Sequence, residues 1–168
     1  MLMGLTKSSV GRSAVDSGLI IKKHSPDDKV IALAGNPNVG KSTVFNALTG
    51  LNQHTGNWPG KTVSNAQGYC KTESRGLMLV DIPGTYSLMA HSAEEEVARN
   101  FICFGKPDAV AVVCDATSLE RNLNLVLQIA EISKRTVVCV NLMDEAKRKG
   151  IKIDLKRLSK ILGVPVAG

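Results

Sequence analysis

The feature that most constrains this chain is the octapeptide Gly-Asn-Pro-Asn-Val-Gly-Lys-Ser at residues 35–42, which matches every fixed position of the pattern G-x-x-x-x-G-K-[ST]. That pattern is informative where a strand precedes it and a helix follows it. Residues 30–34 are a short apolar run of the buried-strand type, and residues 41–48 have helical character. We therefore predict a loop that binds nucleotide phosphates, in preference to a glycine-rich turn with a chance Lys-Ser pair.

The residue types of this loop suit a polyphosphate. Gly35 and Gly40 have no β-carbon, so the backbone can wrap closely around phosphate oxygens and aim N–H groups at them, beside the positive end of the following helix. Lys41 is expected to reach the β- and γ-phosphates, and the Ser42 hydroxyl is expected to ligate Mg²⁺. These roles predict binding of a nucleoside triphosphate with its magnesium ion.

A second motif, Asp81-Ile82-Pro83-Gly84, follows the apolar run at residues 77–80. Asp81 should therefore lie at the carboxyl end of a strand, where it can hold Mg²⁺ through water beside Ser42. Gly84 is expected to donate its N–H to the γ-phosphate. Many switch GTPases have glutamine as the next residue, which orients the attacking water, and this chain has Thr85. Slow intrinsic hydrolysis is the consequence we expect.

A third motif, Asn141-Leu142-Met143-Asp144, follows the apolar run at residues 136–140. A carboxylate at Asp144 can accept two hydrogen bonds from guanine, a donor pair that adenine lacks. The alternative role is an N-cap on a helix over residues 145–149, and the two roles are compatible. Leu142 stands where a lysine is usual, so it can cover the purine face but adds no cation, which predicts modest affinity.

Two longer strings, Asn57-Trp58-Pro59-Gly60 and Gly84-Thr85-Tyr86-Ser87-Leu88, followed by residues 94–100, resemble the switch regions of the ferrous iron transport protein B family. The similarity extends from about residue 28 to residue 168. It implies a Ras-like P-loop GTPase domain at the cytoplasmic face of the cell membrane, joined in the whole protein to a helical spacer and a membrane domain that carries Fe²⁺. It also implies a further guanine-binding loop after the strand-like residues 164–168. Neither that loop nor those domains is among the 168 residues, so we expect weakened guanine binding.

The resemblance also assigns metal ligands. Thr62 matches the threonine that completes the Mg²⁺ shell, and Asn38 matches an asparagine that ligates K⁺ together with the backbone carbonyls of Gly56 and Trp58. An ion there would act as an arginine finger does. The ordinary alternatives are a loop threonine for Thr62, a turn former for Asn38 and an exposed loop aromatic for Trp58.

The expected site can be summarised by role. The expected catalytic residues are Lys41, Asn38, Thr62 and Gly84. The expected nucleotide-binding residues are Gly35, Asn36, Pro37, Asn38, Val39, Gly40, Lys41, Ser42, Thr43, Asn141, Leu142, Met143 and Asp144. The expected metal ligands are Ser42, Thr62 and Asp81 for Mg²⁺, and Asn38, Gly56 and Trp58 for K⁺.

Strand and helix patterns alternate along the chain, which predicts a three-layer α/β/α fold with a mixed, mostly parallel sheet. The expected strands are 29–34, 63–72, 76–82, 109–115 and 136–141, and the expected helices are 41–50, 93–104, 118–133, 144–149 and 154–162. A short turn at residues 73–75 predicts an antiparallel hairpin at one edge of the sheet. Residues 1–28 have no strong period and are predicted to be a flexible leader, with the GTP-binding domain at 29–168.

Composition excludes some classes of protein. No apolar run reaches the roughly 18 residues of a spanning helix, and the cysteines and histidines have no zinc or iron spacing, so reduced cytosolic thiols are expected. The net charge is +6, and Lys and Arg are concentrated in residues 147–160. This cluster could touch RNA or an anionic membrane, but Leu155, Leu158, Ile161 and Leu162 recur through it at helical spacing. We therefore favour an amphipathic helix whose solvent-exposed face carries these Lys and Arg residues over a nucleic-acid-binding surface.

Three functions remain open from the sequence. The favoured one is a GTP-hydrolysing switch domain that regulates ferrous iron uptake. The second is an RNA- or ribosome-associated assembly GTPase, which the basic cluster mildly favours and the strings at 57–60 and 84–88 oppose. The third is a nucleotide-sensing module with negligible turnover, which Thr85 favours. The sequence makes no prediction of oligomeric state.

Overall fold

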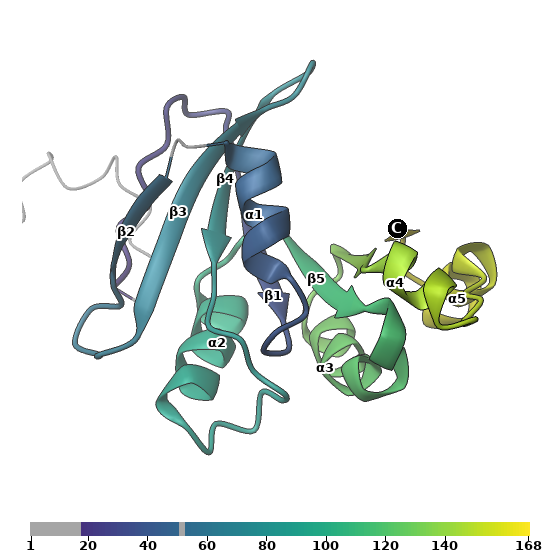
Figure 1. Ribbon diagram of the computed structural model, residues 1–168. Coiled ribbons are helices and arrows are strands. Elements are labelled where there is room, and N and C mark those ends of the chain that lie inside the picture. The colour runs from purple at the N-terminus through teal and green to yellow at the C-terminus, as the bar shows by residue number, and fades with distance from the viewer. Residues whose placement is uncertain (1–17, 51–52) are drawn as a thin grey trace, which may run out of the picture.

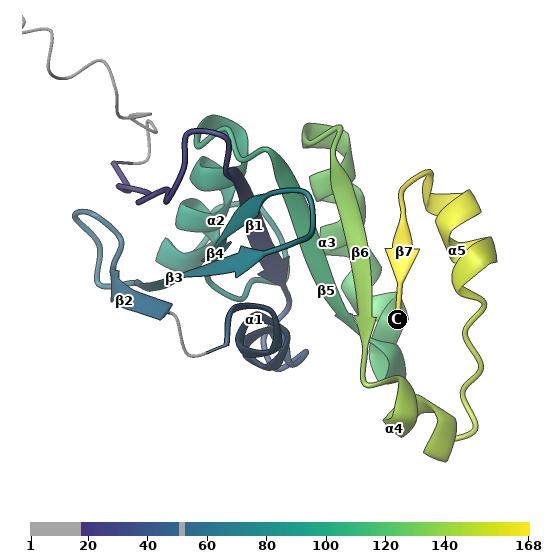
Figure 2. The ribbon, with the colours of Figure 1, turned by 90° about the horizontal axis from the view of Figure 1, so that it is seen from above.

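A seven-stranded mixed sheet organises the chain, as seen in the computed structural model, which describes residues 18–50 and 53–168 (Figures 1 and 2). The strands are β1 (Lys29–Gly35), β2 (Gln53–Asn57), β3 (Ser64–Lys71), β4 (Gly76–Asp81), β5 (Ala109–Asp115), β6 (Thr136–Asn141) and β7 (Val166–Ala167). Their order across the sheet is β2-β3-β4-β1-β5-β6-β7. All neighbours pair in parallel except β2 with β3 and β3 with β4, which are antiparallel.

Helices cover both faces of this sheet. They are α1 (Lys41–Thr49), α2 (Ala93–Phe104), α3 (Leu119–Ile132), α4 (Met143–Arg148) and α5 (Leu155–Leu162), with a 3₁₀ turn, η2 (Ala116–Ser118), before α3. Figure 2 shows α1 on one face and α2 with α3 on the other. The expected three-layer fold is therefore confirmed.

Alternation along the central strand explains the two apolar layers. In β1, Val30, Ala32 and Ala34 belong to the apolar cluster on the α2 and α3 side, whereas Leu33 belongs to the cluster around Phe45 of α1. Successive side chains of a strand point to opposite faces, and a parallel strand covered on both faces is apolar throughout. This is why residues 30–34 read as an unbroken apolar run.

One strand was not predicted. β2 is a polar edge strand whose residues are mostly exposed, and it pairs antiparallel with β3 through the backbone. The reversed strand β3 does form the expected hairpin with β4, but the expectation that this hairpin lies at the sheet edge was wrong, because β2 pairs outside it. An edge strand needs only backbone partners, so its side chains carry little signal.

The predicted flexible leader falls partly outside the described residues, which begin at residue 18. Residues 18–28 pack onto the domain, with Leu19 5% exposed and Asp28 3% exposed. The Asp28 carboxylate accepts hydrogen bonds from the backbone N–H groups of His24 (2.9 Å) and Ser25 (2.8 Å), which forms the turn that leads into β1.

The basic cluster lies largely on α4, α5 and the segment between them. Leu155, Leu158 and Leu162 pack against the core, as expected for an amphipathic helix, but Ile161 is 71% exposed and does not belong to the buried stripe. Asp154 caps α5 by accepting from the Arg157 N–H at 2.9 Å. Among residues 18–50 and 53–168, no helix is both long enough and apolar enough to cross a membrane.

Candidate functional site

The phosphate-loop pattern connects β1 to α1 at the carboxyl edge of the parallel strands. Gly40 has φ +79° and occupies the N-cap position of α1, where no side chain caps the helix. The first N–H groups of α1 therefore have no capping side chain, which is the arrangement that binds anions. A β-carbon on Gly40 would collide with the side-chain amide of Asn141, so only glycine fits both the conformation and the space.

A hydrogen bond joins this loop to the third motif. The Asn141 amide Nδ2 donates to the Val39 carbonyl at 3.0 Å, across more than a hundred residues of sequence. The side chains of Asn36 and Val39 are buried, at 3% and 2% exposed, which leaves the backbone of the loop to face a ligand. The structure thus brings together the two segments that were predicted to bind phosphate and base.

The second motif packs on the same loop. A β-carbon on Gly84 would lie 3.3 Å from Pro37 Cα, and the Thr85 N–H donates to the Gly35 carbonyl at 3.1 Å. Thr85 itself is only 4% exposed. Its hydroxyl is therefore enclosed rather than presented to a water at the phosphates.

Lys41 and Asp81 form an ion pair at the centre of the site, with side chains 12% and 20% exposed. Burial raises the pKa of the Asp81 carboxyl above its usual range, and the attraction of Lys41 opposes that rise. The lysine ammonium thus lies against the carboxylate that was predicted to face Mg²⁺. A triphosphate with its cation would give each of these two charges a new partner, so the donor set is suited to a magnesium nucleotide.

The end of the third motif presents its carboxylate to solvent. Leu142 has φ +60° and is the N-cap residue of α4, which places Asp144 in the first turn of that helix. The alternative role of Asp144 as an N-cap residue was therefore wrong. The Asp144 side chain is 81% exposed, and its contact with Arg148 is a long one of 3.4 Å. It is accessible to a base held beside the loop.

The predicted metal ligands Thr62, Gly56 and Trp58 lie away from the phosphate loop. Residues 58–63, which we call the switch loop, join β2 to β3 and are closed by hydrogen bonds from the Trp58 N–H to the Val63 carbonyl (2.7 Å) and from the Lys61 N–H to the Trp58 carbonyl (3.0 Å). Figures 1 and 2 both show this loop standing apart from the loop between β1 and α1. The structure therefore brings neither Thr62 to Ser42 and Asp81, nor the carbonyl groups of Gly56 and Trp58 to Asn38, and these ligand sets stay predictions.

The switch loop is instead held against α2. Trp58 is 3% exposed, so the reading of it as an exposed loop aromatic was wrong, and its indole meets the Phe101 ring edge-on with centroids 5.2 Å apart. Lys61 Nζ lies 2.8 Å from Glu96 Oε2, and this bond and its charge lower the pKa of the Glu96 carboxyl. The loop thus has one apolar and one ionic attachment to α2.

The segment after Gly84 is held against α3. The Arg121 guanidinium lies 4.5 Å above the centre of the Tyr86 ring, and the Leu88 N–H donates to Gln128 Oε1 at 2.7 Å. Ser92 caps α2 by accepting from the Glu95 N–H at 3.1 Å. Neither attachment to α3 has a sequence signal of its own, because Arg121 and Gln128 read as ordinary polar positions of a helix.

Cys114 on β5 and Cys139 on β6 are strand thiols whose pKa values burial raises. Burial raises the pKa of the Cys114 thiol to about 12, as expected for a thiol that packs in a strand. Within the described part of the chain, no group of three or more His, Cys, Asp or Glu side chains is arranged around a common point.

Comparison with known families gives a match over most of the chain. The model of the family described as "Ferrous iron transport protein B" matches residues 29–168. The chain is 44% identical over 140 residues to the Fe(2+) transporter FeoB of Escherichia coli (strain K12), and to that of Salmonella typhimurium, covering 81% of this chain. It spans only 18% of the length of those relatives.

Solved structures give the same likeness. The G domain of the T. maritima FeoB iron transporter superposes with a TM-score of 0.78 at 43% identity, covering 82% of this chain and 84% of that one. The cytosolic domain of the same transporter in its GMPPNP form gives 0.79 at 44% identity, covering 82% and 55%. The cytosolic domain of L. pneumophila FeoB gives 0.78 at 41% identity, covering 82% and 60%.

Proposed function

This chain belongs to the ferrous iron transport protein B family and has its GTPase-type P-loop fold, and we propose that it is the GTP-hydrolysing switch domain of a bacterial-type Fe(II) transporter, at the cytoplasmic face of the cell membrane. One observation carries the proposal. The Asn141 amide bonds the Val39 carbonyl at 3.0 Å, which fixes the guanine motif against the phosphate loop in a single site. The membrane domain of the same polypeptide is the partner that the proposal implies.

Nucleotide binding rearranges the charges already in the site. Lys41 leaves Asp81 and binds the β- and γ-phosphates. The N–H groups of α1 and of Gly84 donate hydrogen bonds to phosphate oxygens, and the Asp144 carboxylate accepts hydrogen bonds from guanine. Ser42, Asp81 and, after the switch loop moves, Thr62 are the residues that would hold Mg²⁺. When bound, Mg²⁺ neutralises charge on the β- and γ-oxygens. Because Thr85 is enclosed, no side chain at that position orients water, which supports slow turnover.

K⁺ is a separate part of the proposal. Asn38 is an exposed residue of the phosphate loop. The Trp58 carbonyl already accepts a hydrogen bond from the Lys61 N–H, and it lies with the switch loop, away from Asn38. In the described conformation these groups therefore do not meet around one point, and the proposal requires the switch loop to move before K⁺ binds. Asn38, Gly56 and Trp58 could form the ligand set only after the switch loop has moved.

GTP hydrolysis in KCl against NaCl at matched ionic strength tests the function, with Asn38→Ala as the variant and ATP as competitor. We expect GTP to bind without displacement by ATP, and K⁺-specific stimulation that Asn38→Ala abolishes. Equal competition by ATP would refute the guanine site. GTP binding with negligible turnover in both salts would instead support the nucleotide-sensing alternative. The assembly-GTPase alternative is not favoured, because the matched family is a transporter family.

A further inference from the structure

We propose that residues 18–22, which we call the strap, hold the switch loop in its withdrawn position and so slow its engagement with bound nucleotide. The inference rests on the proposed function, because it assumes that the switch loop moves when GTP binds. The family match begins at residue 29, so the strap lies outside the matched residues.

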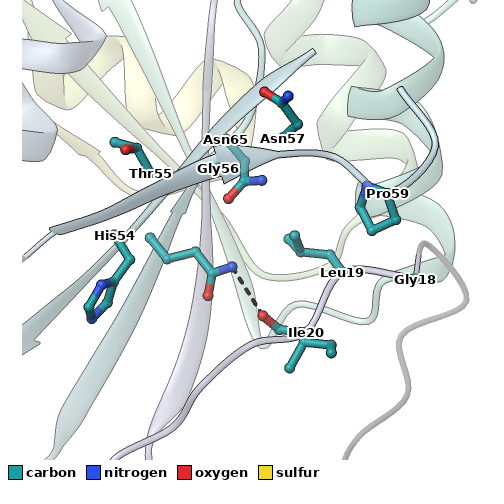
Figure 3. A pocket seen from close by; sticks show the side chains of 10 residues that line it. Gly18, Leu19, Ile20, His54, Thr55, Gly56, Asn57, Pro59 and Asn65 are labelled. Carbon is teal, nitrogen blue, oxygen red and sulfur yellow. Dashed lines mark hydrogen bonds between the residues drawn. The ribbon is translucent and has the colours of Figure 1, made fainter. Parts of the chain in front are cut away.

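The strap contributes a buried side chain to the seat of the switch loop. Leu19 is 5% exposed and belongs to the same apolar cluster as Trp58 (3%) and Val63 (7%), the residues at either end of the loop. A β-carbon on Gly18 would lie 3.4 Å from Pro59 Cβ, so the two segments run at van der Waals distance. Figure 3 shows Gly18 and Leu19 beside Pro59. The loop thus packs on Phe101 of α2 through Trp58 and lies against the strap through Pro59.

Further contacts fix the strap along β3. Gln67 Nε2 donates to the Ile20 carbonyl at 3.1 Å (Figure 3), and just beyond the strap the His24 ring stacks on Tyr69 with centroids 4.2 Å apart and planes 5° from parallel. The Ile20 side chain is 62% exposed. The strap is therefore attached by one buried leucine and a backbone acceptor, while its next apolar side chain contributes little to the seat.

The attachment is only partly packed. A hollow of about 290 Å³ lies between the strap and the hairpin of β2 and β3, lined in part by His54, Asn65 and Gln67 (Figure 3). The hollow is open to solvent, so the strap touches the hairpin along only part of its length and few contacts must break when the two segments part. The strap is suited to a contact that opens and closes.

The effect follows from a difference between two states. Thr62 can reach Ser42 and Asp81 only if the switch loop leaves the position described here, and Pro59 then separates from Gly18 of the strap. A contact made in one state alone shifts the population toward that state by its own free energy. The strap therefore favours the withdrawn loop, and weakening it should release the loop.

Two adjacent substitutions test this with a matched control. Leu19→Ser removes the buried side chain, and Ile20→Ser removes an exposed side chain of the same size. Trp58 is the chain's one tryptophan, so its fluorescence reports on the loop directly after rapid mixing with Mg²⁺ and GMPPNP. Relative to the unsubstituted chain, we expect the Trp58 signal to change about tenfold faster in Leu19→Ser and less than about twofold faster in Ile20→Ser. The reason is that losing a buried apolar side chain costs much more stability than losing an exposed one. Equal rates in the two variants would overturn the strap.

A reversible cross-link tests the opposite direction and protects against a folding defect in Leu19→Ser. Gly18→Cys with Pro59→Cys places two thiols at a Cβ separation of about 3.4 Å, close to the roughly 3.5–4.5 Å of disulfides, although Gly18 at φ +70° will be strained as cysteine. The oxidised variant should lose the fast Trp58 response and the reductant should restore it. An unchanged response with the disulfide confirmed by mass spectrometry would refute the strap. If fluorescent GTP fails to bind even the unsubstituted chain, the proposed function itself fails and the strap with it.

Discussion

The phosphate loop and the switch loop are built on different principles. The phosphate loop is held by its own neighbours: Gly40 fits against Asn141, Val39 is buried, and Thr85 bonds the Gly35 carbonyl. The switch loop is held by side chains from a distant element, namely Phe101 and Glu96 of α2, and its Pro59 lies against Gly18. The first is a loop fixed by contacts within the predicted site, whereas the second depends on contacts with an element that lies outside that site.

The largest effect on the phosphate loop is expected from Gly40→Ala. The added methyl meets the Asn141 amide and the residue must hold φ +79°, so we expect GTP affinity to fall on the order of a thousandfold, as strain and lost phosphate bonds together predict. Fluorescent-GTP titration measures it. Gly150→Ala is the control, because Gly150 has φ +73° with no atom within 4 Å of its added carbon. Similar losses of affinity in both variants would mean that a strained positive φ weakens binding by destabilising the domain, and not through the collision with Asn141.

Asp144→Ala tests whether the same half also selects the base. Two charge-assisted hydrogen bonds would be lost, so we expect GTP to bind on the order of 100-fold more weakly and the preference over ATP to shrink equally. The side chain is 81% exposed, so the melting temperature should hardly change. Glu145→Ala, the next carboxylate along α4, should leave the affinity nearly unaltered. A matching loss in Glu145→Ala would assign the effect to general charge.

The smallest effect is expected at the switch loop, from the loss of its ionic attachment to α2. Lys61→Ala removes the ion pair with Glu96, and because both side chains are over a third exposed we expect the Trp58 response to GMPPNP to quicken by only about two- to threefold, and less in high salt. Rapid-mixing fluorescence at two salt concentrations measures this. Lys71→Ala is a control, since Lys71 is an exposed lysine on β3. A salt-independent acceleration would show that the charge is not what holds the loop.

The same pair predicts a pH dependence. Lys61 lowers the pKa of Glu96 from its ordinary 4.5, so the attachment is present at pH values above 4.5 and is lost as the pH falls through the lowered value. The Trp58 response should therefore quicken in acid in the unsubstituted chain and less so in Lys61→Ala. An identical acid response in both would exclude Glu96 as the titrating group.

The two halves also differ in how far they could be predicted. The phosphate loop and its partners follow from local patterns, because a glycine, a lysine and a strand-to-helix turn fix the backbone there. β2 could not be predicted, because an edge strand of polar residues pairs through its backbone alone. Trp58 and Leu19 owe their burial to residues far away in sequence, so no pattern within residues 18–22 or 58–63 predicts that burial. The role of Lys61 likewise required the position of Glu96.

The ion pair between Lys41 and Asp81 links the binding of the cation to the binding of the nucleotide. A free divalent cation must displace an ammonium group already bound to its carboxylate, and a nucleotide without a cation would take the lysine and leave the carboxylate facing phosphate charge. Only the two ligands together satisfy both groups. Binding of the nucleotide and binding of the cation at this ion pair should therefore be coupled, with each ligand favouring the other.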